Sequence, residues 1–399
     1  MKRRRVKITG LGFVTPAGIG KDKFWQGILE PISRVTVATK YPEGAGAFVS
    51  AEVPDFRLDR YYYTDSKRMP RHTQFALAAA ALAAKDAGFE LSDFRDQGAI
   101  VMIGATLMDF GVINKGVDII VRKGPLNALP TAVSTALVSA IGATVGEAIG
   151  GTTRTMSLQS ACCSGLDAIG RAAEMIANGE GEIAVCGGAE APLYFHPMLE
   201  LKLAGLAPGN PEMAERQCRP FDLWRTTGVI GEGSCVMILE PETSPRPGYA
   251  YVGGYSYASD PVGEPCAGLA QALRLTLANT GLRPKDIECI SAWGPGHKML
   301  DAAEAHVLKD FFGKELAHIP AASIKGAIGN PLGAAGAIQV GCAALGIKHS
   351  AIPPTVNWQH SDPSCPLNLS GQPRFIEHRN ALINAHGLSG ANACLVLNQ

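Results

Sequence analysis

The chain has 399 residues, with 36 lysines and arginines balanced by 36 aspartates and glutamates, and 46% of its residues are hydrophobic. These values are typical of a well-packed globular protein and exclude a largely disordered one. A net charge of zero gives no general basis for binding nucleic acid or an anionic membrane, and no apolar run approaches the length of a membrane span.

The ten cysteines are scattered through the sequence without the spacing of metal ligands. We therefore expect neither a metal site nor a cofactor. Cys162 and Cys163 are adjacent, and no secretory signal precedes the first strand-like segment. These features predict a reducing environment and a cytoplasmic protein.

The first half of the sequence alternates short apolar runs with helical patterns. The expected strands are 6–8, 99–103, 155–159, 183–186 and 234–239, and the expected helices are 73–87 and 132–149. Continuous apolar strands between helices indicate a mostly parallel sheet that is covered on both faces. Residues 107–129 lack clean periodicity, so we expect an irregular excursion there.

A proline-rich connector, residues 241–247, divides the chain into two expected units, 1–242 and 248–399. After the connector the same plan repeats. The expected strands are 249–252, 287–292, 321–324, 381–384 and 393–397, and the expected helices are 269–280, 301–311 and 333–347.

The stretch from Leu158 to Leu166, Leu-Gln-Ser-Ala-Cys-Cys-Ser-Gly-Leu, joins an expected strand to an amphipathic helical pattern. A sharp strand-to-helix turn places Cys162 at a helix N-terminus, where free backbone N–H groups stabilise an anion and lower the pKa of a thiol. Gly165 allows neighbouring backbone to approach closely. The local sequence alone fits two interpretations equally, a nucleophilic thiol or two small residues packed in a core.

The motifs resemble those of the β-ketoacyl synthases, the condensing enzymes of fatty acid and polyketide synthesis, over nearly the whole chain. The matching stretches are 6–12, 68–75, 160–165, 186–190, 220–222, 231–233, 325, 333–336 and 353–357. The resemblance implies a thiolase-like α/β fold, with two pseudo-repeated βαβαβ halves in a five-layer α-β-α-β-α arrangement. It also makes Cys162 the acyl-accepting nucleophile and leaves Cys163 as a packing residue.

Three departures from the family pattern affect the expected site. The two catalytic histidines of the elongating synthases correspond to Trp293 and Asn330, and His386 takes the position of the gating phenylalanine. The backbone N–H groups of Cys162 and His386 are then expected to form the oxyanion hole, and His386 is either a base or a gate. His297 replaces a small hydroxyl residue.

Three further residues fit a family polar network below the active site. Asp301, Glu304 and Lys325 are expected there as scaffold, with the buried lysine held by the carboxylates. The stretch 259–266 is shorter than in typical elongating synthases, which removes the basis for transferring their acyl-pocket details to this chain.

The resemblance implies an acyltransferase or condensing enzyme that accepts an acyl group on Cys162 from an acyl carrier protein or coenzyme A thioester. Without the histidine pair, ordinary decarboxylative elongation is not expected. Two alternatives remain: a non-condensing partner subunit that resembles a chain-length factor, and a hydrolase or cyclase that uses the same acyl-cysteine. The family further implies a homodimer, or a heterodimer with another ketosynthase.

Overall fold

The computed structural model describes residues 3–38, 41, 47–208 and 210–399. Its main sheet has eleven strands, and β2 pairs only with β1 at its margin. The path through the others is β12 (Ala321–Ala322), β11 (Cys289–Ser291), β13 (Asn380–His386), β14 (Ala391–Asn398), β10 (Tyr251–Ser259), β1 (Val6–Thr15), β9 (Gly233–Pro241), β7 (Ala184–Glu190), β5 (Ile100–Gly104) and β6 (Arg154–Leu158). A small second sheet contains β3 (Thr36–Val37), β4 (Val49–Ala51) and β8 (Ile230–Gly231), and β2 spans Gly18–Ile19.

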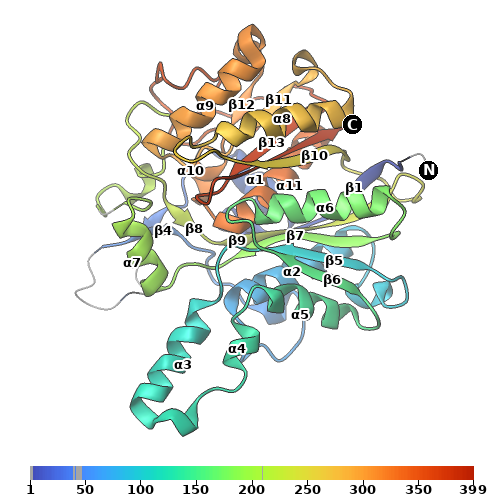
Figure 1. The fold of residues 1–399 in the computed structure, drawn as a ribbon, viewed down its shortest axis with the longest axis vertical. Coiled ribbons are helices and arrows are strands. Elements are labelled where there is room, and N and C mark those ends of the chain that lie inside the picture. Colours follow the sequence, from blue (N-terminus) through green and yellow to red (C-terminus); the bar gives the residue numbers. More distant parts are fainter. Residues whose placement is uncertain (1–2, 39–40, 42–46, 209) are drawn as a thin grey trace.

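The helices complete five layers, as Figure 1 shows. The outer layer of the first half contains α2 (Arg71–Asp86) and α5 (Ser139–Ile149), and that of the second half contains α8 (Ala267–Thr280) and α9 (Lys298–Phe312). Between the two arms of the sheet lie α6 (Ser164–Ala177) and α11 (Ala335–His349). The remaining helices are α1 (Lys21–Leu29), α3 (Phe110–Lys123), α4 (Ala132–Thr135), α7 (Phe195–Leu203) and α10 (Lys325–Ile328). The predicted α-β-α-β-α arrangement is confirmed.

The sheet is mixed, so the expectation of a mostly parallel sheet is wrong. The pairs β5–β6, β5–β7, β11–β12 and β11–β13 are parallel, whereas β1 pairs antiparallel with both β9 and β10. The contact between β1 and β10 joins the two halves into one continuous sheet. Apolar runs alone could not reveal this direction, because strands buried on both faces look alike whether their neighbours are parallel or antiparallel.

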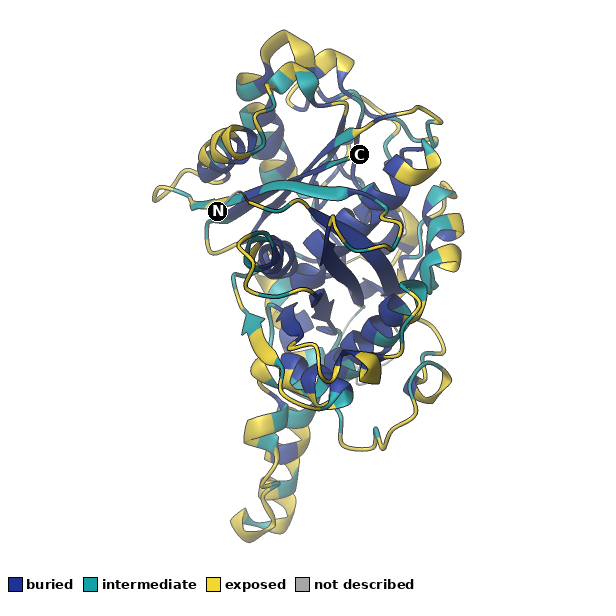
Figure 2. Ribbon diagram, turned by 90° about the vertical axis from the view of Figure 1, so that its right-hand side faces the viewer, coloured by how far each residue is buried: buried dark blue, intermediate teal, exposed yellow. Residues whose placement is uncertain are grey.

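The excursion at residues 107–129 contains a regular helix, α3, which the sequence pattern did not indicate. Asp109 caps α3 by accepting a hydrogen bond from the backbone N–H of Val112 at 2.8 Å. The helix and the chain that returns from it extend away from the body of the protein, and most of their residues are exposed (Figure 2). The helix expected over 132–149 is divided into α4 and α5 at residues 136–138.

The layers place the ends of β6, β11 and β13 around the N-terminus of α6, close to the centre of the molecule. An apolar cluster at this point includes Cys162, Ile230 and Leu332. In the described part of the chain, no helix combines the length and the apolar character needed to cross a bilayer.

Candidate active site

Cys162 lies in a tight turn between β6 and α6. Ala161, the residue before it, has a φ of 52°, a left-handed conformation that costs a residue with a side chain about 1 kcal/mol or more. The turn aligns Cys162 with the first turn of α6, which begins at Ser164. The predicted strand-to-helix placement of the cysteine is therefore present.

A network of side chains holds this strained turn. The Ser164 hydroxyl accepts a hydrogen bond from the backbone N–H of Ser160 at 2.9 Å and donates one to the Ala161 carbonyl at 2.5 Å. The Ser160 hydroxyl donates to the Asp167 carboxylate, which also accepts a 2.8 Å hydrogen bond from the Tyr255 hydroxyl. The turn is thus tied both to α6 and to β10 across the central layer.

Glycines allow the surrounding backbone to close on the turn. A Cβ atom on Gly165 would lie 2.6 Å from the carbonyl oxygen of Gly333, and one on Gly387 would lie 2.8 Å from the Ala161 Cβ. Both distances are shorter than any ordinary contact, so a larger residue would push these elements apart. The expectation that Gly165 permits a close approach is confirmed, and Gly387 brings the β13–β14 turn onto the nucleophile.

The Cys162 side chain, only 2% exposed, faces a narrow cavity of about 30 Å³, which has room for about two water molecules. The other residues that line the cavity are mainly apolar. They are Leu201, Leu206, Gly228, Ile230, Trp293, Pro295, His297, Leu300, Asn330, Leu332 and Leu388. The cavity therefore brings together Cys162, Trp293 and Asn330, three of the four residues predicted to be catalytic.

Burial raises the pKa of the Cys162 thiol to about 12, and the nearby Glu190 carboxylate contributes to the increase. Lys325 and the backbone N–H groups of Leu388 and Cys162 act in the opposite direction, but they do not offset the loss of solvation. The expected low pKa is therefore absent from this closed form, since the helix N-terminus cannot compensate for full burial.

The residue that faces the thiol from the β13–β14 turn is Leu388, not His386. The backbone N–H of Leu388 lies close enough to lower the thiol pKa, and its side chain lines the cavity, whereas His386 is not among the lining residues. The assignment of the gate and of the second oxyanion-hole N–H to His386 is corrected accordingly. The residues that reach the nucleophile are Gly387 and Leu388, which follow the end of β13, and not His386, the last residue of that strand.

His386 is instead the first member of a buried polar chain. Its Nδ1 lies 2.9 Å from the Asn392 Oδ1, and the Asn392 Nδ2 donates to the Asp260 Oδ1 at 2.6 Å. Because the amide nitrogen of Asn392 already donates to Asp260, its oxygen accepts, so Nδ1 of His386 carries the proton. The imidazole also packs edge-to-face on Trp293, with ring centroids 5.3 Å apart.

Trp293 and Asn330 stand on the cavity wall, where the resemblance places the two catalytic histidines. Trp293 follows β11 and is 1% exposed, and Asn330 is 7% exposed. The backbone of Asn330 is held beside β8, since its N–H donates to the carbonyl of Val229, the residue before that strand, at 2.7 Å and its carbonyl accepts from the N–H of Gly231 at 2.9 Å. Neither the indole Nε1 of Trp293 nor the Oδ1 of Asn330 has a hydrogen-bond partner in the described structure.

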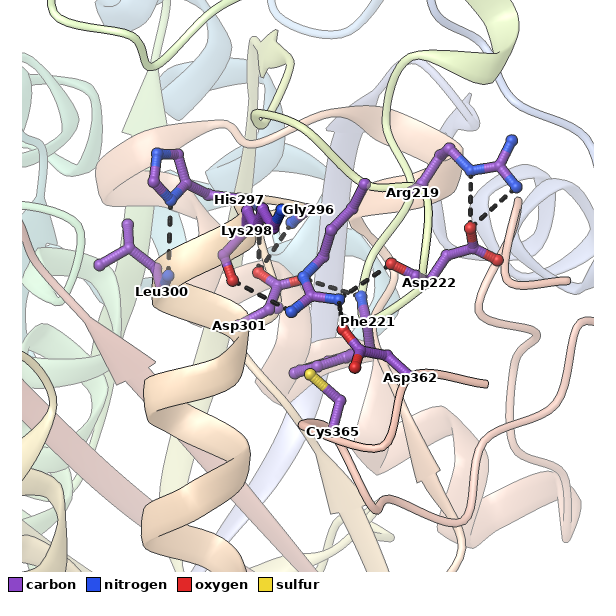
Figure 3. Close-up of polar contacts among 12 residues, drawn as sticks. Arg219, Phe221, Asp222, Gly296, His297, Lys298, Leu300, Asp301, Asp362 and Cys365 are labelled. Atoms are coloured by element: carbon purple, nitrogen blue, oxygen red, sulfur yellow. Dashed lines mark hydrogen bonds and ion pairs between the residues drawn. The ribbon is translucent and has the colours of Figure 1, made fainter. Parts of the chain in front are cut away.

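Asp301 and Glu304 fix the loop that carries Trp293. The Glu304 carboxylate accepts 2.8 Å hydrogen bonds from the backbone N–H groups of Trp293 and Gly294. The Asp301 carboxylate accepts 3.1 Å hydrogen bonds from Gly296 and His297, an arrangement visible in Figure 3. Burial raises the pKa of both carboxyl groups. These contacts support the scaffold role that the sequence predicted.

Lys325 makes different contacts from those expected. Among the described residues, its Nζ donates to the main-chain carbonyl of Trp293 and, at 3.4 Å, to the Gln339 Oε1 rather than to a carboxylate. Asp301 and Glu304 lie close enough to favour the charged form, yet burial dominates and lowers the Lys325 pKa to about 8. The idea of a lysine held directly by carboxylates is therefore wrong, although all three residues belong to one buried region.

Sequence reasoning missed the roles of Leu388 and Glu190. The Glu190 carboxylate accepts backbone hydrogen bonds from Thr106 at 2.6 Å and Gly333 at 3.0 Å, and burial raises its pKa to about 7. It joins three elements around the nucleophile. The family motif that ends at this position was the one available signal.

The other cysteine and histidine near the site have separate environments. Cys163 is fully buried in the core, and its thiol lies 3.4 Å from the Ala391 carbonyl, as expected of a packing residue. The Nδ1 of His297 accepts a hydrogen bond from the backbone N–H of Leu300 at 3.4 Å. No cluster of three or more potential metal ligands occurs in the part of the chain that the structure describes.

A five-layer α-β-α-β-α fold with a cysteine in the turn before the central helix is a thiolase-like architecture. The chain belongs to the β-ketoacyl synthase family, because residues 3–244 match the family's N-terminal domain and residues 249–359 its C-terminal domain. It is 29% identical to 3-oxoacyl-[acyl-carrier-protein] synthase 2 of Synechocystis, over 99% of this chain and 98% of that protein.

Two solved structures share the fold over almost their whole length. The ishigamide ketosynthase/chain length factor superposes with a TM-score of 0.93 at 28% identity, and covers 100% of this chain and 99% of its own. A type II polyketide ketosynthase in complex with its acyl-carrier protein, AntDE:AntF, has a TM-score of 0.90 at 27% identity and covers 99% of both chains.

Proposed function

We propose that this protein is an acyl-transfer or condensing enzyme that carries its acyl group on Cys162. The observation that supports this most directly is the position of Cys162 in the strained turn before α6, facing a cavity beside two backbone N–H groups. The acyl donor is the thioester of an acyl carrier protein or of coenzyme A, in fatty acid-like or polyketide metabolism. The carrier protein in the relatives' names and in the AntDE:AntF complex supports this donor class.

In the first half-reaction the Cys162 sulfur attacks the thioester carbonyl carbon. The backbone N–H groups of Cys162 and Leu388 are the donors available to the resulting oxyanion. Because burial holds the thiol protonated, attack requires that the donor thiol accept its proton during the exchange, or that binding of the substrate change the environment of the sulfur. Cys162 is regenerated when the acyl group leaves.

A second candidate is a non-condensing partner subunit. The observation that favours it is the size of the cavity, since about 30 Å³ beside Trp293 leaves no room for a long acyl chain in this form. The likeness to the ishigamide ketosynthase/chain length factor is consistent with such a role. Retention of the cysteine in its turn favours the enzyme. A hydrolase or cyclase differs only in the nucleophile that removes the acyl group.

Intact-mass analysis tests the proposal. The purified protein is incubated with a panel of acyl carrier protein and coenzyme A thioesters, and we expect one added acyl mass on the peptide that contains Cys162. The Cys162→Ala variant should remain unlabelled, whereas Cys163→Ala, which changes the adjacent packing thiol, should still be labelled. Equal labelling of the Cys162→Ala variant contradicts the assignment. Absence of labelling, together with activation of a second ketosynthase, identifies the partner role.

A further inference from the structure

Two residues that line the Cys162 cavity each carry a buried polar atom without a hydrogen-bond partner among the described residues. The two groups are the indole N–H of Trp293, which can only donate, and the amide oxygen of Asn330, which can only accept. A buried polar atom without a hydrogen bond costs about 1–3 kcal/mol, so a ligand that satisfies both groups gains a corresponding advantage. The two groups therefore describe the hydrogen-bonding pattern of what enters the cavity.

The rest of the cavity is suited to an uncharged group. Its other side chains are mainly leucine and isoleucine, and no ammonium or guanidinium group of a described residue lines it. The Nζ of Lys325 donates instead to the main-chain carbonyl of Trp293 and to Gln339. Burial and the nearby Arg225 lower the pKa of His297, which favours its neutral form. A carboxylate or enolate that reaches the two orphaned atoms would meet one indole donor and the acceptor oxygen of Asn330.

We propose that the second substrate is an alcohol, whose hydroxyl oxygen accepts a hydrogen bond from the Trp293 Nε1 with one lone pair, donates its O–H to the Asn330 Oδ1 and keeps its second lone pair for attack. This inference rests on the proposed acyl-Cys162 and goes further by naming the nucleophile that removes the acyl group. A hydroxyl group supplies both the acceptor and the donor that the two orphaned atoms require. The small size of the cavity fits such a terminal group, with the remainder of the substrate outside.

The transfer step is balanced without any further reactant. The free lone pair of the hydroxyl oxygen attacks the carbonyl carbon of the acyl-Cys162 thioester, and a carbon–oxygen bond forms. The bond between the carbonyl carbon and Sγ then breaks, and its electron pair returns to sulfur. The proton lost by the nucleophile goes to Sγ, which regenerates the thiol. Because burial raises the pKa of the Cys162 thiol, the departing thiolate is basic enough to accept that proton.

The first experiment uses the unmodified protein. Acyl-Cys162 enzyme is prepared, freed of donor, and mixed separately with propylamine, propanol, a malonyl carrier thioester, or buffer alone. We expect propanol to discharge the enzyme at least tenfold faster than buffer, with formation of the propyl ester. The same acyl-enzyme after denaturation corrects for spontaneous alcoholysis and aminolysis. Discharge by water alone, by propylamine but not by propanol, or only by the malonyl thioester with release of carbon dioxide, overturns the proposal.

Two substitutions then test the hydrogen bonds. Trp293→Phe keeps an aromatic ring and removes the N–H, and Asn330→Leu removes the amide at similar volume. Each should slow discharge by propanol about tenfold, the effect of one hydrogen bond worth about 1.4 kcal/mol. Trp25→Phe is the matched control, because Trp25 lies on α1 and packs on His349 at 5.4 Å. Equal rates in all three variants overturn the proposal.

The two proposals fail in distinguishable ways. If no acyl-Cys162 forms from any thioester, the proposed function is wrong and the second step is never reached. If acyl-Cys162 forms but is discharged only by water, by propylamine or by a malonyl-derived carbanion, the proposed function stands and the inferred nucleophile is wrong. Because discharge starts from acylated enzyme, differences in loading between variants do not enter the comparison.

Discussion

The buried ammonium group of Lys325 donates a hydrogen bond to the main-chain carbonyl oxygen of Trp293. The same tryptophan receives support from the opposite direction, because its backbone N–H donates to Glu304. A lysine and a glutamate thus fix one peptide segment from both sides and hold the indole against the Cys162 cavity. The position of Trp293 is therefore sensitive to the charge of Lys325.

This arrangement predicts a pH-dependent stability. Burial lowers the folded-state pKa of Lys325 to about 8, from 10.5 in the unfolded chain. Between these values the unfolded state binds a proton that the folded state does not, so stability rises with pH across this window. Relative to Lys325→Met, the wild-type protein should gain roughly 3 kcal/mol of unfolding free energy between pH 8 and 10.5. Urea unfolding at several pH values measures it, and a constant difference contradicts the assignment.

His72 predicts a second dependence at acidic pH. Its ring is 1% exposed and lacks a hydrogen bond in the described structure, and burial lowers its pKa to about 4, although Asp109 lies 3.6 Å away. As the pH falls from 6.5 to 4, the unfolded state binds a proton that the folded state does not bind, so the free energy of unfolding falls. His72→Phe should remove this part of the decline in urea unfolding, while exposed His306→Phe should not.

The exposed edge of the main sheet at β6 predicts that the protein forms a dimer. Strand β6 ends the strand order, three of its five residues are exposed, and Met156 is 54% exposed, so a row of backbone groups is available for pairing. We expect a homodimer by light scattering at micromolar concentration, or a heterodimer when a cognate ketosynthase is supplied. Met156→Lys should weaken the dimer, and Val262→Lys, in a fully exposed loop, should not. A monomeric wild-type protein contradicts the prediction.

The contact between His386 and Asn392 predicts a structural effect of the histidine. His386→Phe leaves the Asn392 oxygen buried without its 2.9 Å partner, so the variant should lose about 1–3 kcal/mol of unfolding free energy. A double-mutant cycle with Asn392→Ala should give a coupling energy above 0.5 kcal/mol. If His386→Phe instead leaves stability unchanged and slows acylation, His386 acts as a base and the pairing with Asn392 is secondary.

The sequence was sufficient for the parts of the site that depend on local pattern. The expected strand before Cys162 and the expected helix after it are both present. The short strand, the small residues of the turn and the apolar face of the following helix together specify this local backbone path. The resemblance to the β-ketoacyl synthases also placed together Trp293, which follows β11, and Asn330, which follows α10, and both line the Cys162 cavity.

Features that depend on the third dimension were not predictable. The sequence around Gly387 and Gly390 does not show which residue of the β13–β14 turn faces the thiol. Because β13 ends at His386, the residue that reaches the thiol is Leu388. The thiol pKa depends on how completely neighbouring elements exclude water, which no local pattern records. Helix α3 was missed because Gly111 and Gly116 lie within it, and glycine disfavours a helix interior. Its apolar residues Val117 and Val121 are exposed rather than packed on the core.

The replacement of the histidine pair predicts slow release of carbon dioxide from a malonyl carrier thioester. An enolate that forms beside Cys162 would find one indole N–H and one neutral amide in place of two imidazoles, and loss of such stabilising groups costs a few orders of magnitude in rate. The double substitution Trp293→His and Asn330→His should raise release at least tenfold over the wild type. Trp293→Phe with Asn330→Leu, which opens the cavity without adding imidazoles, is the control and should give no increase. Wild-type release as fast as that of an elongating synthase means that another group stabilises the enolate, and the cavity must then be occupied differently from the way its two orphaned atoms indicate.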